Sequence, residues 1–327
     1  MSLDLKFHGM LLADTYRMRQ YKKAISRVIR KGDVVLDIGA GTGILSFFAC
    51  QAHAKRVYAI ERTDTIHLAE ELAKENGFSQ KIVFLKQDIQ DVLLPGKVDV
   101  IISELISNFG LGENILKIVH DTKKRLLKPN GRCIPQTLKM HFVPVEATAS
   151  YKKILFGQEK SGQAFFSLDF SAYRQMAVNE IYKIRFSPAN YLAQETRIFS
   201  FDFLDTIPSG ILNNAVSFSV LRKGILHGFC GYFSASLAAG VNLTNKPPCL
   251  STAWTNLFFP LEEPVVVRRG DQIMVGLTAV EKEDTVFYRW KTSIIPAKSN
   301  KRLRETQFDQ TNRIGDFFGM SIFSKRA

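Results

Sequence analysis

The sequence contains little cysteine and no long apolar run. Its 327 residues include four cysteines, none of them in the CxxC spacing of a zinc or redox motif. We therefore expect no zinc site and no disulfide framework, and a reducing, cytoplasmic compartment fits best. No apolar stretch approaches the ~18 residues of a membrane-spanning helix, and the first residues are not typical of a signal peptide. Since no cluster of His, Cys and Asp is evident, no metal is expected.

Acidic residues are few relative to basic ones. Lysine and arginine number 44 and aspartate and glutamate 31, an excess of 13. Such an excess attracts polyanions without specificity, or serves only solubility, and the sequence leaves both readings open. The basic residues are spread along the chain, apart from 298–304 and the pair Lys325 and Arg326. We therefore expect no specific nucleic-acid partner and no membrane partner.

The first 135 residues alternate between strand and helix signals. Short apolar runs predict four strands, and longer amphipathic segments predict three helices, the last of them closed by the KPNG sequence 128–131. Runs this apolar are typical of strands buried on both faces, which favours a parallel sheet between helices. The sequence thus predicts a Rossmann-like domain over 1–135. The expected strands are 34–38, 56–61, 81–86 and 98–103, and the expected helices 44–53, 64–76 and 115–127.

The pattern changes at Pro135. Beyond it, short β-like runs separated by turn signals predict a β-barrel or sandwich domain over 136–327. A segment of mixed character lies between Gly157 and Gln194. It fits an insertion that packs on itself, or an arm that reaches a partner subunit.

A glycine-rich turn, DIGAGTG, joins the first strand to the first helix. Its GxGxG spacing after an acid differs from the GxGxxG that seats the pyrophosphate of NAD, and favours S-adenosylmethionine (SAM). Asp37 is positioned to hold the amino-acid end of SAM through water, beside Gly39 and Gly41. Glu61 ends the second strand, where a carboxylate accepts hydrogen bonds from ribose hydroxyls. The adenine is expected near residues 87–91.

Two acids flank a glycine-containing loop after the fourth strand. Glu104 ends the strand, and Glu113 follows nine residues later across LISNFGLG. Two carboxylates that face one pocket repel each other unless a cation lies between them, and a guanidinium can pair with both. The alternative is that Glu113 is only an acid at the N-terminus of the next helix.

From His8 to near its end the chain resembles the protein arginine N-methyltransferase family. The resemblance rests on HGMLLADTYRMRQYKKAI, VLDIGAGTGILSFFA, SELISNFGLGE, LLKPNGRCIP, HGFCGYF and STAWTNLFFPLEEPV. It implies a Rossmann-like SAM-binding domain and a β-barrel with a helical dimerisation arm at about 165–193. It also implies a homodimer that transfers methyl groups from SAM to the guanidino nitrogen of arginine in protein or peptide.

Carried over by position, the resemblance implies a role for each matching residue. His8 and Arg17 contact SAM, Arg17 at its carboxylate; Asp37, Gly39 and Gly41 hold the methionine end, Glu61 the ribose, and Ile89 with Gln90 the adenine. Glu104 and Glu113 clamp the acceptor guanidinium, and Asp14, Asn108 and Trp254 line its pocket. Three alternatives remain: His8 as a surface histidine, Trp254 as a core aromatic, and Arg17 paired with an acid on its own helix.

The sequence departs from the family pattern near the acceptor. Ala253 stands where the family's Thr-His-Trp loop has histidine, Gln90 replaces an acid, and Asn108 replaces an aromatic residue. No tyrosine-rich helix precedes His8 in this sequence. Three functions therefore remain open: an arginine methyltransferase, a methyltransferase of a small molecule or peptide natural product at a guanidine, amine or hydroxyl, and a SAM-binding dimeric scaffold without catalysis.

Overall fold

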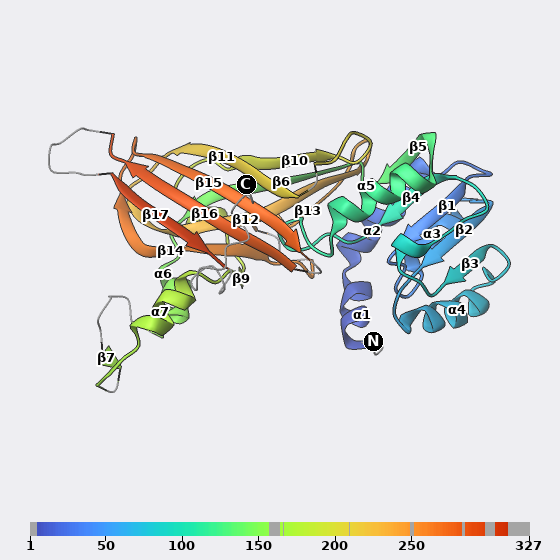
Figure 1. Cartoon of the computed structure of the whole chain (residues 1–327), viewed down its shortest axis with the longest axis horizontal. Helices are drawn as coiled ribbons and strands as arrows, with labels where there is room; N and C mark the ends of the chain where they lie inside the picture. Colours follow the sequence, from blue (N-terminus) through green and yellow to red (C-terminus); the bar gives the residue numbers. More distant parts are fainter. Residues whose placement is uncertain are drawn as a thin grey trace, which may run out of the picture.

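A parallel sheet of five strands forms the N-terminal half of the molecule (Figure 1). The structure is a computed structural model that describes residues 5–156, 164–165, 167–208, 210–248, 252–282, 285–297 and 305–312. The strand order is β3-β2-β1-β4-β5, so the order reverses between β1 and β4. The strands are β1 (Val34–Ile38), β2 (Arg56–Ile60), β3 (Ile82–Leu85), β4 (Val98–Ser103) and β5 (Leu127–Ile134).

The central strands are almost wholly buried because helices cover the sheet. All but one residue of β1 and all but one of β4 are buried. This agrees with the near-continuous apolar runs from which these strands were predicted. The helices are α2 (Thr15–Val28), α3 (Ile44–Gln51), α4 (Thr65–Glu75) and α5 (Ile115–Leu126), with a short 3-10 turn, η1 (Ile89–Asp91).

The KPNG sequence follows the end of α5 at Leu126, within one residue of the predicted end of this helix. It lies within β5, where the pairing with β4 shifts register between Leu127 and Arg132. The extra residues form a bulge, and Pro129 among them has no N–H to donate to the ladder. The parallel sheet ends at Ile134, and the next strand begins at Thr137 in a different sheet. The change of sheet therefore falls at Pro135.

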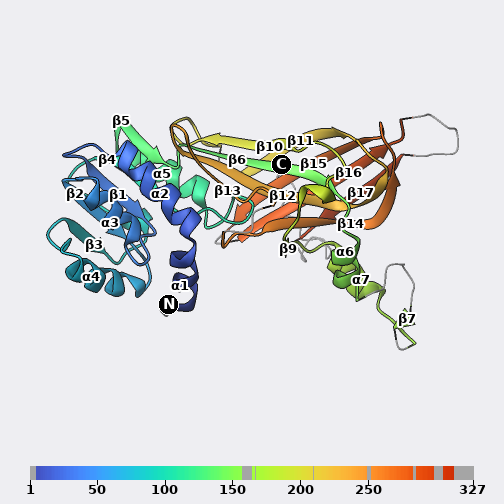
Figure 2. The ribbon, with the colours of Figure 1, turned by 180° about the vertical axis from the view of Figure 1, so that it is seen from behind.

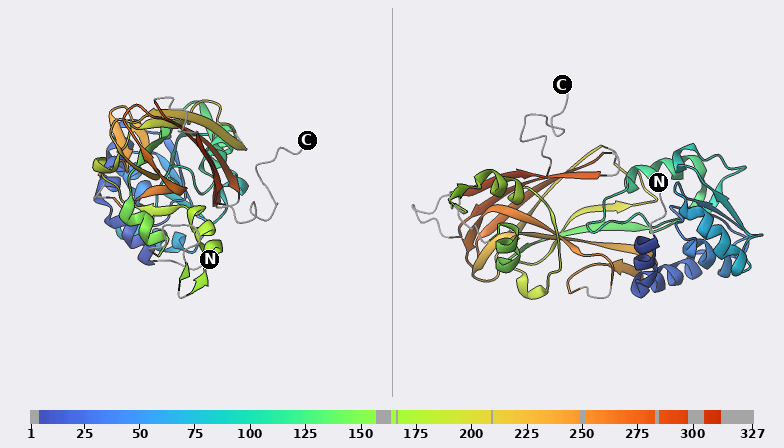
Figure 3. Two further views of the ribbon diagram at one scale, coloured as in Figure 1. Left: turned by 90° about the vertical axis from the view of Figure 1, so that its left-hand side faces the viewer. Right: turned by 90° about the horizontal axis from the view of Figure 1, so that it is seen from below.

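The C-terminal half consists of two antiparallel sheets that close on each other. The edge strands β10 and β11 are neighbours, as are β14 and β17, so the two sheets approach a barrel (Figure 3). One sheet contains β6 (Thr137–Val145), β9 (Tyr182–Ile184), β10 (Thr196–Asp202), β12 (Gly224–Ala238), β13 (Val241–Thr244) and β14 (Asn256–Val267). The other contains β11 (Ile211–Ser219), β15 (Gln272–Lys282), β16 (Thr285–Ile295) and β17 (Thr306–Thr311).

An arm projects from the barrel at the end distant from the parallel sheet (Figure 1). It comprises α6 (Thr148–Ile154), β7 (Ala164–Phe165), β8 (Leu168–Asp169) and α7 (Ser171–Val178). The projecting segment therefore spans residues 148–178, whereas the predicted arm spans about 165–193. Its last part belongs to the barrel, because β9 pairs with β14 and Tyr191 forms a bridge to Val145.

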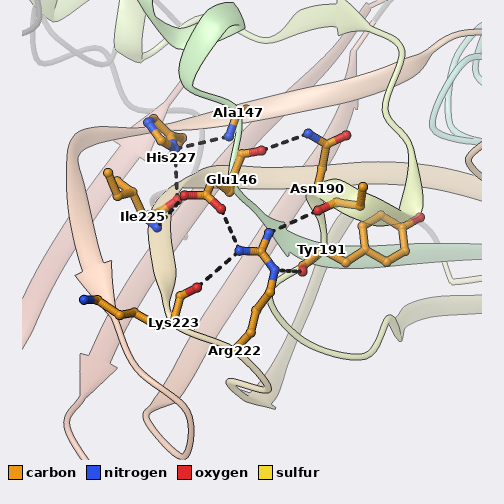
Figure 4. A network of polar contacts seen from close by, with 9 residues as sticks. Glu146, Ala147, Asn190, Tyr191, Arg222, Lys223, Ile225 and His227 are labelled. Atoms are coloured by element: carbon orange, nitrogen blue, oxygen red, sulfur yellow. Dashed lines mark hydrogen bonds and ion pairs between the residues drawn. The ribbon is translucent and has the colours of Figure 1, made fainter.

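A polar network holds the chain where it returns from the arm (Figure 4). The Arg222 guanidinium donates to Glu146 Oε2 at 2.6 Å and to the Tyr191 carbonyl at 3.1 Å. Glu146 Oε1 accepts from the Ile225 N–H at 3.1 Å, and the Glu146 carbonyl accepts from Asn190 Nδ2 at 3.0 Å. The network includes η2 (Pro188–Asn190) and fixes the base of the arm to the barrel.

Helix α2 joins the two halves (Figure 2). It packs against α3 and β5 on one side and against β12 and β13 on the other. The Tyr21 hydroxyl donates to the Ser103 carbonyl at 3.0 Å, and Arg27 donates to the Ala239 carbonyl at 2.6 Å. The preceding helix, α1 (Leu5–Ala13), has no buried residue. Helix α2 therefore contacts both halves of the molecule.

Several sequence predictions fall outside the described residues. They concern the basic run 298–304, the pair Lys325 and Arg326, and Cys249. Within the described residues, no helix is long and apolar enough to cross a membrane.

Candidate functional site

Two loops meet where the strand order reverses. Ile38 and Ser103 are paired at the carboxyl ends of β1 and β4, so Gly39 and Glu104 follow side by side. In an open α/β sheet, the crevice outside the strand ends at such a point is where ligands bind. The topology thus brings the glycine turn together with Glu104, the first acid of the loop 104–113, which we call the double-glutamate loop because Glu104 and Glu113 flank it.

The glycine turn has a left-handed backbone that suits close approach of a ligand. Gly39 has φ 69° and Gly41 has φ 53°, a region that side chains disfavour. A Cβ at Gly41 would lie 3.4 Å from the His8 ring. Glu61 accepts from the Gly41 N–H at 3.1 Å and from the Thr63 N–H at 2.8 Å. Its carboxylate is therefore fixed by backbone donors beside the turn.

Two adjoining cavities occupy the crevice. Their volumes are about 400 and 320 Å³. The larger cavity extends to Gln87, Asp88 and Ile89, and the smaller extends to Glu104 and Trp254. The residues that line both are Phe7, His8, Gly39, Glu61, Leu105 and Glu113. The double-glutamate loop therefore adjoins the glycine turn within one crevice.

A guanidinium is already bound to Glu104. Arg17 Nη1 lies 2.8 Å from Glu104 Oε2, and both side chains are largely buried. The Arg17 guanidinium also lies over the Trp254 ring, 5.4 Å from its centroid, within the range of a cation–π contact. Arg17 Nε and Glu104 Oε1 are buried without a hydrogen-bond partner. The pair therefore leaves one donor and one acceptor without a partner in the protein, a costly state for buried polar atoms.

Burial changes the acidity of two carboxyl groups. It raises the pKa of Glu104 to about 7, with Arg17 lowering this pKa and Glu113 raising it. Burial also raises the pKa of Asp37 to about 6, against a hydrogen bond from Ser46 Oγ at 2.6 Å. Asp37 lies behind the glycine turn and lines neither cavity, and its Oδ1 is buried without a partner. Any contact of Asp37 with a ligand in the cavities would therefore need a bridging water.

Asp14 connects the N-terminal helices to the barrel. Its carboxylate caps α2 by accepting from the Arg17 N–H at 2.9 Å. It also accepts from Thr252 Oγ1 at 2.6 Å and from the Ala253 N–H at 2.8 Å. The backbone N–H of Ala253 and the Thr252 hydroxyl thus satisfy Asp14 although no histidine side chain stands at position 253.

The double-glutamate loop is held by the barrel. Trp254 Nε1 donates to the Ile106 carbonyl at 2.9 Å. Asn108 Oδ1 accepts from the Thr255 N–H at 2.7 Å, so this side chain fastens the loop as well as lining the smaller cavity. Phe109 is fully buried among barrel aromatic rings. Trp254 is therefore both a core aromatic and part of the cavity wall, two roles that were posed as alternatives.

The adenine prediction needs one correction. Ile89 is buried and lines the larger cavity, whereas the Gln90 side chain is exposed and lines neither cavity. The reason is local: Asp88 caps η1 by accepting from the Gln90 N–H at 2.9 Å, which turns residue 90 outward. Gln87 and Asp88 provide the polar groups there instead. His8 lines both cavities, and its Nε2 lies 3.1 Å from Thr65 Oγ1.

The sequence did not reveal two charged residues near the site. Lys183 on β9 lines the smaller cavity, and Glu281 on β15 accepts from the Gly112 N–H at 3.3 Å. Both come from barrel strands far along the chain, and no local motif marks them. Among the described residues, no group of three or more His, Cys, Asp or Glu side chains could hold a metal ion.

Family models match both halves of the chain. Residues 29–180 match a model described as a methyltransferase domain, and residues 138–314 match one described as the PRMT5 oligomerisation domain. With the crevice described above, these matches define a protein with a Rossmann-like methyltransferase domain followed by an oligomerisation domain.

Individual relatives identify the family. The chain is 30% identical to protein arginine N-methyltransferase 6 of Xenopus tropicalis over 291 residues, 84% of each protein. It is 31% identical to protein arginine N-methyltransferase 2 of the same species over 285 residues, 82% of this chain and 65% of that protein. The chain belongs to the protein arginine N-methyltransferase family, as its motifs predicted. It spans less than two thirds of the length of the second relative.

Two solved structures share the fold. The open form of Arabidopsis thaliana protein arginine methyltransferase 10 superposes with a TM-score of 0.81 at 24% identity, over 94% of this chain and 97% of that one. The Trypanosoma brucei PRMT1 enzyme–prozyme complex with AdoHcy gives 0.82 at 24% identity, over 94% and 98%. The predicted combination of a Rossmann-like domain and a β-barrel is thereby confirmed.

Proposed function

We propose that the protein transfers a methyl group from SAM to a guanidino nitrogen of arginine in a protein or peptide. The observation that carries this proposal is the bound guanidinium of Arg17 on Glu104, in a cavity that Glu113 also lines. A site that already binds one guanidinium through one carboxylate oxygen has the chemistry to bind a second through the other. Membership of the arginine N-methyltransferase family supports the same reaction.

The polar atoms of the crevice fit SAM. The Arg17 Nε donor suits the cofactor carboxylate, and Asp37 Oδ1 suits its amine through water. Glu61, fixed by backbone N–H groups, suits the ribose hydroxyls, and Ile89 covers the base. His8 adjoins the glycine turn from α1. When bound, SAM supplies a methyl group on a positively charged sulfur, open to in-line attack.

Glu104 and Glu113 act on the acceptor. A guanidinium is a poor nucleophile because its charge is delocalised and its pKa exceeds ~12. Carboxylates paired with two of its nitrogens draw positive charge toward them and leave the third nitrogen more electron-rich. Most of the acceleration then comes from orientation and fixed charge. The departing proton can pass to a carboxylate of the pair or to water.

The decisive experiment uses labelled SAM with arginine-rich peptides, free guanidines and a cell lysate. We expect label in the peptides and loss of label in Glu104→Gln, with SAM binding retained by calorimetry. Glu70→Gln is the matched control, since Glu70 lies on α4 with 41% of its side chain exposed. SAM binding without transfer to any acceptor would refute the proposal and favour a non-catalytic scaffold.

A second candidate is methylation of a small guanidine or a peptide natural product. Lys183 favours it, because a lysine in the wall of the smaller cavity repels an arginine-rich peptide more than a small, singly charged acceptor. In the same assay, label confined to free guanidines would select this candidate. Label in peptides that increases in Lys183→Ala would select the first.

We further propose that the protein is a homodimer joined through the arm. The arm exposes large apolar side chains, which a monomer would leave in water. The match to an oligomerisation domain over 138–314 supports this assembly. Sedimentation at micromolar concentration is expected to give twice the chain mass, and a monomer mass would refute the dimer. The exposed residues are Phe156, Leu168, Phe170, Tyr173 and Met176.

A reducing, cytoplasmic compartment also remains a proposal. Cys50, Cys133 and Cys230 are buried free thiols, and burial raises the pKa of Cys50 to about 11. Such thiols need no oxidising environment. Localisation of a tagged chain outside the cytoplasm would contradict this.

A further inference from the structure

A third carboxylate lies beneath the double-glutamate loop. Glu281 stands near the end of β15 and is half-buried. Its Oε1 accepts from the N–H of Gly112, the residue just before Glu113. Neither the motifs of the sequence nor the cavity linings include Glu281. Its contact is therefore with the backbone that carries a proposed substrate ligand.

The loop is sterically tight where Glu281 contacts it. Gly112 has φ 157°, and a Cβ there would lie 2.7 Å from Ser107 Cβ. Glu113 and Asn114 follow with φ 50° and 53°, a left-handed conformation that costs a residue with a side chain about 1–3 kcal/mol. Such a backbone persists only where the surroundings impose it. The Ser107 hydroxyl bond to the Leu111 carbonyl and the Glu281 bond to Gly112 are two contacts that do so.

A carboxylate is a costly choice for this contact. Burial raises the pKa of Glu281 to about 7, and the Gly112 N–H only partly offsets that cost. Tyr288 on β16 faces Glu281, and its pKa is raised by burial and then by the charge of Glu281. Of the described ionisable residues, Lys282 follows Glu281 on the same strand, and Glu113 follows Gly112 on the loop. A neutral glutamine side chain would accept the same hydrogen bond without burying a charge. We therefore expect the negative charge of Glu281 to have a function of its own.

We propose that ionised Glu281 is a positioning residue, which fixes Gly112 and thereby aims the Glu113 carboxylate at the acceptor guanidinium. The proposal rests on the proposed methyltransferase function. A charge-assisted hydrogen bond is roughly twice as strong as a neutral one, so the loop is held more firmly when Glu281 carries its charge. Glu281 does not touch the acceptor and acts only through the loop.

The test compares Glu281→Gln with the wild type between pH 6 and pH 9. Because glutamine resembles the protonated acid, kcat is expected to match at pH 6 and to fall about fivefold below wild type above pH 8. KM and the Kd for SAM stay within about twofold, since the loss lies in transition-state geometry. The melting temperature above pH 7 is unchanged or higher, because the variant no longer buries a charge. Glu305→Gln, at the opposite end of the same sheet, is the matched control and changes none of these values.

Amide exchange of the loop gives a readout that does not need activity. Above pH 8, the Gly112 N–H is expected to exchange about fivefold faster in Glu281→Gln than in the wild type, and faster still in Glu281→Ala. A ratio of wild-type to variant kcat that does not change with pH, or equal exchange in all three proteins, would overturn the proposal. If the wild type methylates nothing, the proposed function fails, and the exchange data alone decide whether Glu281 holds the loop.

Discussion

Replacing Asp14 by alanine should remove the hydrogen bonds by which the N-terminal helices are joined to the barrel. The buried carboxylate accepts three hydrogen bonds, from the Arg17 N–H, the Thr252 hydroxyl and the Ala253 N–H. Loss of the helix cap alone costs about 1 kcal/mol. Removing a buried charge that satisfies two further donors brings the total to about 3–5 kcal/mol. Asp14→Asn should cost about 1–2 kcal/mol, because one amide oxygen still accepts at the position of Oδ1 or Oδ2 while the NH₂ group faces the donors at the other position.

Chemical denaturation followed by fluorescence and by circular dichroism would measure these differences. Trp254 adjoins the affected contacts, so its emission reports on them directly. Thr252→Val removes one donor and should cost about 1 kcal/mol, and the double variant should be less than additive because the two groups share a bond. Asp64→Ala is the control: Asp64 precedes α4 without a side-chain cap and forms only an exposed ion pair.

Two outcomes would contradict this role of Asp14. If Asp14→Ala lowers the free energy of unfolding by less than about 1 kcal/mol, like Asp64→Ala, the hydrogen bonds from Thr252 and Ala253 to Asp14 do not hold the two halves together. Strictly additive effects of Asp14→Ala and Thr252→Val would also contradict the shared bond.

Three further predictions follow from burial. At acid pH, kcat/KM should fall with a pKa near 7 as Glu104 is protonated in the free enzyme. The corresponding pKa in kcat should be lower, because the bound acceptor cation stabilises the carboxylate. Identical pKa values in the two profiles would contradict this. Burial raises the pKa of Asp37 from 3.8 to about 6, so the charge of Asp37 lowers the free energy of unfolding as pH rises through this window. Asp37→Asn should therefore stabilise the protein at pH 8 by roughly 3 kcal/mol in thermal unfolding and weaken SAM binding in calorimetry. Equal stability of the two proteins would refute the assignment. Phe109→Ala should lower the free energy of unfolding by about 3–5 kcal/mol in urea, and a loss below 1 kcal/mol would show that the ring does not anchor the loop.

The regular part of the fold was predictable because its signals are local. The strands Val34–Ile38 and Val98–Ser103 have the predicted bounds, since strands buried on both faces must be apolar throughout. The glycine turn was predictable because only glycine readily adopts its backbone. The bulge in β5 and the extent of the arm were not, because proline and glycine signals mark irregular backbone without saying whether pairing resumes.

Within the site, the sequence identified the acids but not their surroundings. The spacing of Glu104 and Glu113 predicted that both face one cavity, and both line it. Ala253 stands where the family has histidine, and the sequence did not reveal that Thr252 and the Ala253 N–H hydrogen-bond the Asp14 carboxylate. Gln90 turns outward because a neighbouring cap sets the direction of its backbone.

The sequence by itself determined the two-part architecture, the glycine turn and the paired acids, because each depends on the chemistry of adjacent residues. Only the tertiary structure brought Lys183 to the cavity wall and Glu281 beneath the double-glutamate loop. It also decided that Arg17 binds Glu104 across the crevice. These contacts join residues tens to hundreds of positions apart, and their partners are selected by how the barrel packs against the parallel sheet.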